Sequence, residues 1–118
     1  MIAVIFEFTP TDGRAQDYMD LAAGLNDVVK DFDGFISIER FESIKNKGNF
    51  VSLSFWRDEE AVRKWRNLQQ HREAQKQGRA GIFSAYRLRI SKVIRDYGMD
   101  ERGQAPEDSL SFHGGVHG

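Results

Sequence analysis

Apolar residues recur at helical spacing in two separate parts of the chain, and this pattern constrains the fold more than any other feature. The first stripe has the spacing i, i+3, i+4, i+7 of an amphipathic helix and consists of Tyr18, Leu21, Ala22, Leu25, Val28, Val29 and Phe32. The second stripe is shorter and consists of Ala61, Val62, Trp65 and Leu68. We expect Asp12 and Asp58 to cap these two helices by accepting hydrogen bonds from their first amides. Gly78 and Gly81 are expected to end the second helix.

The segments around the two helices have the β-branched and aromatic composition of strands. These segments are residues 2–8, 35–44, 50–56 and 82–97, and a polar turn at 45–49 joins the middle two. The order β-α-β-β-α-β predicts an α+β, ferredoxin-like fold, in which a four-stranded antiparallel sheet carries both helices on one face. We expect this domain to span residues 1–98. The polar residues 99–118, which contain several glycines and two histidines, are expected to form a C-terminal tail.

The face of the sheet away from the helices is predicted to be unusually apolar for a surface. Alternation along the strands places there Phe41, Phe50 and Trp56, beside Ser37, Glu39, Ser52, Ser54, Arg87 and Arg89. An apolar patch of this kind is seldom left in water. Two copies of the chain that pair sheet against sheet would cover it, and cover by the C-terminal tail is the alternative. We therefore expect a homodimer through the sheet face.

The composition excludes several classes of function. Acidic and basic residues are interspersed and the formal net charge is −1, so we expect no binding to nucleic acid or to a membrane. The chain has no cysteine, which excludes disulfides and thiolate sites and fits a reducing cytoplasm. Its apolar N-terminal segment lacks the features of a signal peptide and is too short to span a bilayer, so we expect a cytoplasmic protein. His113 and His117 have i, i+4 spacing, but Gly114 and Gly115 oppose a helix there, and no metal site is expected.

Four runs of residues resemble the antibiotic biosynthesis monooxygenase family, whose members are small dimeric α+β barrels built from a ferredoxin-like unit. The runs are FDGFISIERFES, LSFWRDEEAVRKWRN, HREAQKQGR and FSAYRLRI, and the resemblance covers residues 1–97. Its most specific parts are residues 32–35 and the spacing of Trp56, Glu60, Ala61 and Trp65. One branch of the family degrades haem with an Asn on the first strand and a Trp and a His on the second helix. Trp65 matches that Trp, but Phe6 or Glu7 stands in place of the Asn.

A second branch of the family contains cofactor-independent oxygenases that act on aromatic phenols. In that branch a Trp and a polar, ring-bearing side chain six residues later line the pocket, and Trp65 and His71 have this spacing. Without a metal or a flavin, the substrate itself must lose a proton and then donate an electron to O₂, so the site needs a base and a dry aromatic slot. We expect His71 to be the base because histidine titrates near neutral pH. Trp65 is expected to be the catalytic pocket wall, and Tyr18, Phe83 and Tyr86 are expected to bind the substrate.

The first hypothesis is therefore a homodimeric monooxygenase that oxidises a small electron-rich aromatic or quinol and needs no cofactor. A haem-binding or haem-degrading monooxygenase, with haem as its cofactor, is one alternative. A non-enzymatic module that binds a small molecule in the same pocket is the other.

Overall fold

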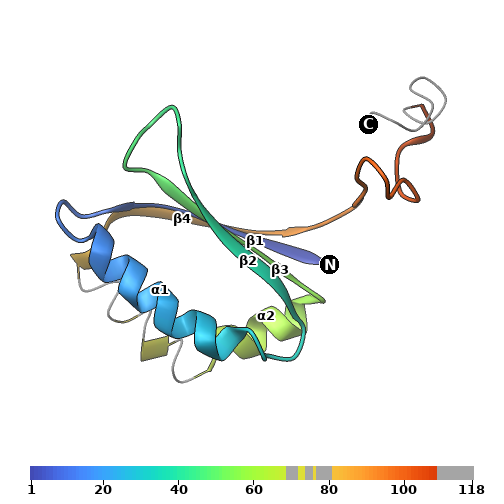
Figure 1. Ribbon diagram of the computed structural model, residues 1–118. Helices are drawn as coiled ribbons and strands as arrows, with labels where there is room; N and C mark the ends of the chain where they lie inside the picture. Colours follow the sequence, from blue (N-terminus) through green and yellow to red (C-terminus); the bar gives the residue numbers. More distant parts are fainter. Residues whose placement is uncertain (69–71, 74–75, 77–80, 109–118) are drawn as a thin grey trace.

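The structure is a computed structural model, and it describes residues 1–68, 72–73, 76 and 81–108. Its elements are β1 (Ile2–Pro10), α1 (Ala15–Val29), β2 (Phe35–Glu42), β3 (Phe50–Trp56), α2 (Glu59–Arg66) and β4 (Phe83–Lys92). The strands form one antiparallel sheet in the order β2-β3-β1-β4. Both helices lie against the same face of this sheet (Figure 1). The predicted ferredoxin-like α+β fold is confirmed.

The two faces of the sheet are assigned by the register of the central strands. Ile2 lies opposite Trp56 and Val4 lies opposite Ser54 in the pairing of β1 with β3. Trp56 is only 2% exposed and belongs to the core that the helices cover. Phe50, Ser52, Ser54 and Trp56 therefore face the helices, and the prediction that they lie on the opposite face is wrong.

This error has a physical cause, because β3 carries apolar side chains on both of its faces. A period of two separates the two sets of residues but does not say which set faces the helices. The two serines suggested a solvent-facing side. Ser52 and Ser54 are in fact buried, and the Ser54 Oγ accepts a hydrogen bond of 2.9 Å from the indole Nε1 of Trp56.

The outer face of the sheet is formed by the other set of residues. Its central strands present the half-buried side chains of Ile5, Val51, Leu53 and Phe55, and Phe41 on β2 is 46% exposed. An Arg89 Nη1 to Glu7 Oε1 hydrogen bond of 2.9 Å joins β4 to β1 on this face. The outer face is thus an apolar strip with a charged border along β4. An apolar outer face was predicted, but β3 contributes Val51, Leu53 and Phe55 to it and not the residues that were predicted.

Several helix and strand boundaries differ from their predictions. The N-cap of α1 is Arg14, whose side chain makes no capping hydrogen bond, so the prediction that Asp12 caps this helix is wrong. The predicted cap of α2 is confirmed, because the Asp58 carboxylate accepts from the Ala61 amide at 2.9 Å. The helix α2 ends at Arg66, where the backbone amide and the side-chain amide of Asn67 both donate to the Arg63 carbonyl. The predicted end at Gly78 lies outside the described residues. The last strand also stops at Lys92, and the chain then leaves the sheet (Figure 1).

Candidate functional site

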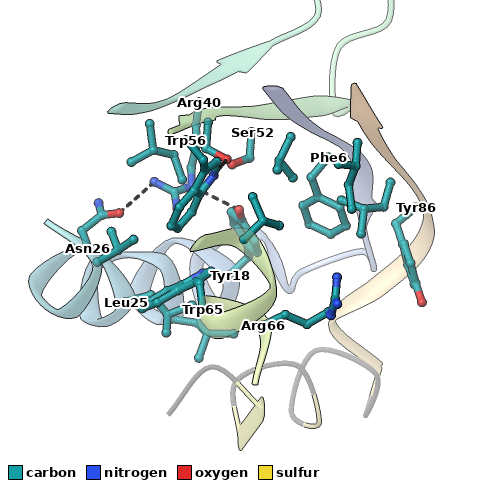
Figure 2. Close-up of a pocket in the computed structure, with 18 of the residues that line it drawn as sticks. Phe6, Tyr18, Leu25, Asn26, Arg40, Ser52, Trp56, Trp65, Arg66 and Tyr86 are labelled. Carbon is teal, nitrogen blue, oxygen red and sulfur yellow. Dashed lines mark hydrogen bonds between the residues drawn. The ribbon is translucent and has the colours of Figure 1, made fainter. Parts of the chain in front are cut away.

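A cavity of about 290 Å³ lies between the sheet and the two helices (Figure 2). All six elements contribute to its lining, which is largely apolar. Its polar lining residues are Tyr18, Asn26, Arg40, Ser52, Ser54, Arg66 and Tyr86. The volume is close to the lower end of the range of roughly 300–1,000 Å³ that is usual for small-molecule sites. The cavity is therefore suited to one compact organic molecule.

Tyr18, Phe83 and Tyr86, the residues predicted to bind substrate, all line this cavity. Tyr18 comes from α1 and its ring centroid lies 5.6 Å from that of Phe83, which in turn lies 6.0 Å from that of Tyr86. Phe8 packs behind Tyr18 with a centroid distance of 4.3 Å. These rings form one continuous aromatic wall, although contact with a substrate stays a prediction.

Trp65, predicted as the catalytic pocket wall, lies on the side of α2 that faces the sheet and lines the cavity. The residue is 8% exposed, and its ring lies 5.3 Å from that of Phe32 and 6.1 Å from that of Trp56, measured between centroids. The structure thus brings Trp65 together with the three predicted binding residues. His71, predicted as the base, lies outside the described residues, and its role stays a prediction.

The position of α2, and with it the position of Trp65, depends on a close contact at the start of β2. A Cβ atom added to Gly34 would lie 2.4 Å from the Cβ of Ala61, and Gly34 has a φ of +90°. Only glycine, which has no Cβ, allows both this close approach and this positive φ. Ala61 precedes Trp65 by one helical turn and shares its face, so the Gly34–Ala61 contact fixes how near Trp65 lies to the sheet.

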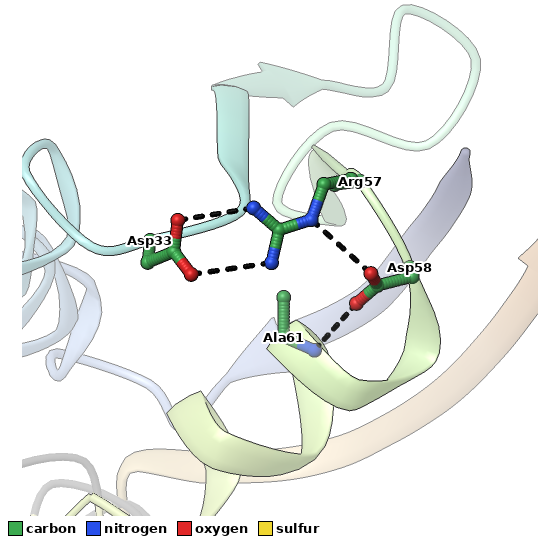
Figure 3. A network of polar contacts seen from close by, with 4 residues as sticks. All are labelled: Asp33, Arg57, Asp58 and Ala61. Atoms are coloured by element: carbon green, nitrogen blue, oxygen red, sulfur yellow. Dashed lines mark hydrogen bonds and ion pairs between the residues drawn. The ribbon is translucent and has the colours of Figure 1, made fainter.

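Arg57 ties together the same two segments (Figure 3). Its guanidinium donates to both Asp33 carboxylate oxygens, at 3.0 and 3.2 Å, and to Asp58 at 3.1 Å, while its own amide donates to the Gly34 carbonyl at 2.8 Å. The Arg57 guanidinium holds the pKa of Asp33 below its ordinary value of 3.8. The Ala61 amide, followed by Arg57, likewise lowers the pKa of Asp58, and the two carboxylates raise the pKa of Arg57.

Arg40 and Asn26 were not predicted to belong to the site. Arg40 donates from Nε to the Tyr18 hydroxyl at 3.1 Å and from Nη1 to the Asn26 Oδ1 at 3.2 Å (Figure 2). The alternation of Ile38 and Arg40 along β2 already places an arginine on the helix-facing side. A basic residue at such a position is a signal for a polar pocket group. Asn26 left no comparable signal, because a polar residue beside the apolar stripe of a helix is expected to face solvent, and Asn26 is in fact exposed.

The described residues contain no group of three His, Asp or Glu side chains that could hold a metal ion. A haem would need an axial ligand from the cavity, where the described lining residues include no His, Cys or Met and only Tyr18 and Tyr86 could ligate iron. The described lining thus offers haem only these two phenol oxygens, and no step below is routed through it.

Comparison with known proteins agrees with this geometry. A sequence model of the family "antibiotic biosynthesis monooxygenase" matches residues 1–77. The chain belongs to the antibiotic biosynthesis monooxygenase family. One relative, named jasmonate monooxygenase ABM, from Pyricularia oryzae, is 40% identical over 93 residues, which are 79% of this chain and 43% of that protein. The chain therefore spans less than half the length of that relative.

Solved structures of family members have the same fold. One from Deinococcus radiodurans, described as a putative antibiotic biosynthesis monooxygenase, has a TM-score of 0.74 at 12% identity and covers 83% of this chain and 97% of its own. SnoaB from Streptomyces nogalater, described as a cofactor-independent oxygenase, has a TM-score of 0.70 at 14% identity and covers 80% of this chain and 94% of its own. Within the described residues, no helix has the length and apolar character needed to cross a membrane.

Proposed function

We propose that this family member is a monooxygenase that oxidises a small electron-rich phenol or quinol in the cavity between the sheet and the helices and needs no cofactor. The observation that carries the proposal is the cavity itself. It has aromatic walls from α1, α2 and β4, and a few hydrogen-bonding groups that can orient a ring. The description of SnoaB as a cofactor-independent oxygenase supports the reaction class.

The chemistry follows from what the substrate must do. A phenol that has lost its proton donates an electron to O₂, and recombination of the two radicals forms a carbon–oxygen bond. Loss of water then leaves a quinone. One atom of O₂ becomes the oxygen of the new carbonyl, and the other leaves as water with the hydroxyl hydrogen and the hydrogen of the ring carbon that was oxygenated. The substrate loses four electrons and O₂ gains four, so no other reductant is needed.

The residues of the chain have three tasks in this reaction. Trp65 and the aromatic residues Tyr18, Phe83 and Tyr86 hold the flat substrate and exclude bulk water, which would otherwise stabilise competing ionic products. His71 is proposed to remove the phenolic proton, since it is the only histidine in residues 1–98.

We further propose that two copies pair through the outer face of the sheet, in the cytoplasm. The apolar strip on β1 and β3, completed by Phe41, is too hydrophobic to remain in water. The cavity lies on the opposite face, so pairing of this kind leaves both cavities of the dimer unobstructed by the sheet contact.

Oxygen uptake tests the function directly. With 1-naphthol or 1,5-dihydroxynaphthalene and no added metal or flavin, the protein should consume O₂, and with ¹⁸O₂ one labelled atom should appear in the quinone. Trp65→Ala and His71→Ala should each lower the rate by at least roughly 10²-fold, whereas Arg63→Gln, on the exposed side of α2, should not. A ligand-dependent rise in melting temperature without O₂ uptake would instead support the binding module.

A further inference from the structure

Arg40 occupies the polar end of the cavity. It lies on β2, opposite Ser52 in the pairing of β2 with β3, and its side chain is half-buried among cavity-lining groups. Figure 2 shows its guanidinium on the Asn26 side of the cavity, with Tyr86 on the other side. Between these two ends the walls of the cavity are apolar.

The Arg40 guanidinium is held in place but is not saturated. It donates one N–H from Nε to Tyr18 and one from Nη1 to Asn26. A guanidinium has five N–H donors. Within the part of the chain that the structure describes, one N–H on Nη1 and two on Nη2 therefore have no partner, and a carboxylate can accept two parallel hydrogen bonds from this edge of the guanidinium.

No negative charge in the described part of the protein balances Arg40. No described Asp or Glu side chain forms an ion pair with Arg40, and no described Asp or Glu lines the cavity. The second cation of the lining, Arg66, is exposed and lies on the Tyr86 side (Figure 2). A half-buried cation with neutral partners and free donors favours an anion that arrives with the ligand.

We propose that the ligand of this cavity carries a carboxylate, which Arg40 binds, while its apolar or aromatic body extends along the wall formed by Tyr18 and Phe83. This inference rests on the proposed function only in placing the substrate in this cavity. Tyr18 and Asn26 are positioning residues, since they hold the guanidinium. The oxidisable ring of the substrate would then lie toward Phe83 and Tyr86, away from its acid group.

A matched pair of ligands tests the proposal by isothermal titration calorimetry at neutral pH. 2-Naphthoate carries the carboxylate, and 2-naphthamide has the same shape without the charge. The wild-type protein should bind the carboxylate more tightly. Arg40→Gln should weaken binding of 2-naphthoate by roughly 10- to 100-fold, the range for loss of charge-assisted hydrogen bonds, and that of 2-naphthamide by less than about 3-fold.

Three variants separate recognition from a structural role of Arg40. Asn26→Asp places a carboxylate beside the guanidinium without removing it and should also weaken 2-naphthoate selectively. Arg40→Lys should retain part of the preference, and Arg63→Gln should retain all of it. Equal losses for the two ligands in Arg40→Gln, or no preference for 2-naphthoate in the wild-type protein, would overturn the proposal. O₂ uptake is measured separately, so a protein that prefers 2-naphthoate but oxidises no phenol would refute the proposed function alone.

Discussion

Replacing Gly34 by Ala should be among the most damaging changes of a single methyl group in this chain. The added Cβ would lie 2.4 Å from the Ala61 Cβ, where 3.4–4 Å is ordinary contact. Overpacking of this kind costs about 1–3 kcal/mol. A left-handed backbone, here at a φ of +90°, costs a non-glycine residue about 1–2 kcal/mol more. The expected loss in the free energy of unfolding is therefore about 2–5 kcal/mol.

The corresponding change in melting temperature follows from the size of the chain. An unfolding entropy of about 2.1 cal/mol/K per residue over 118 residues gives about 0.25 kcal/mol/K. The midpoint should thus fall by about 4 °C for each kcal/mol, or by about 8–20 °C in total. Circular dichroism during thermal and urea unfolding measures this, with protein concentration fixed because self-association shifts the midpoint.

Gly48 provides a matched control for the Gly34 substitution. It has a φ of +94°, but a Cβ added there meets nothing within 4 Å. Gly48→Ala should therefore cost only the backbone part, about 1–2 kcal/mol. Combining Gly34→Ala with Ala61→Gly should recover about 1–3 kcal/mol relative to the sum of the two single changes, because the clash is gone. If Gly34→Ala is no more destabilising than Gly48→Ala, the close approach of β2 to α2 is refuted.

Three further outcomes are expected. The pKa of Asp33 is lowered in the folded protein, so the unfolded chain binds more protons at acidic pH, and the urea midpoint should fall as the pH drops through and below 3.8. Asp33→Asn should make the urea midpoint depend less steeply on pH. An unchanged pH dependence would contradict the ion pair. Trp65→Ala should lower the free energy of unfolding by about 3–5 kcal/mol; a urea-measured loss below about 1 kcal/mol would contradict its burial. Leu53→Arg, on the outer face, should convert a dimer to a monomer in sedimentation velocity, whereas the fully exposed Ile44→Arg should not; a monomeric wild-type protein would end the pairing proposal.

The order of elements was predictable from the sequence because local patterns determine it. The first helix has a long apolar stripe at helical spacing, and the bounds of β3, Phe50–Trp56, coincide with those predicted. The cap of α2 was also predictable, since Asp58 needs only amides within its own first turn. Asp12 failed as a cap because the chain makes a further turn there, in which the Arg14 amide donates to the Thr11 carbonyl at 2.8 Å.

The site was only partly predictable, because it depends on contacts between distant segments. The spacing of Tyr18, Trp65 and Tyr86 within apolar patterns placed these three on faces that line the cavity. Strict alternation would put Phe83 opposite Tyr86, and a register shift between Thr9 and Pro10 in the pairing of β1 with β4 accompanies its place in the lining. The pairing of Arg40 with Tyr18, 22 residues earlier, has no local signature. The orientation of β3 was not predictable either, since only the register with β1 distinguishes its two apolar faces.

The cavity also has a practical property that follows from its walls. The chain contains two tryptophans, Trp56 and Trp65, and both line it with ring centroids 6.1 Å apart. All indole emission of the protein therefore originates beside the cavity, with no distant tryptophan to dilute the signal. An entering aromatic molecule should change that emission, and a quinone formed in place should quench it. Stopped-flow mixing could then follow binding and product formation as separate phases, without a label.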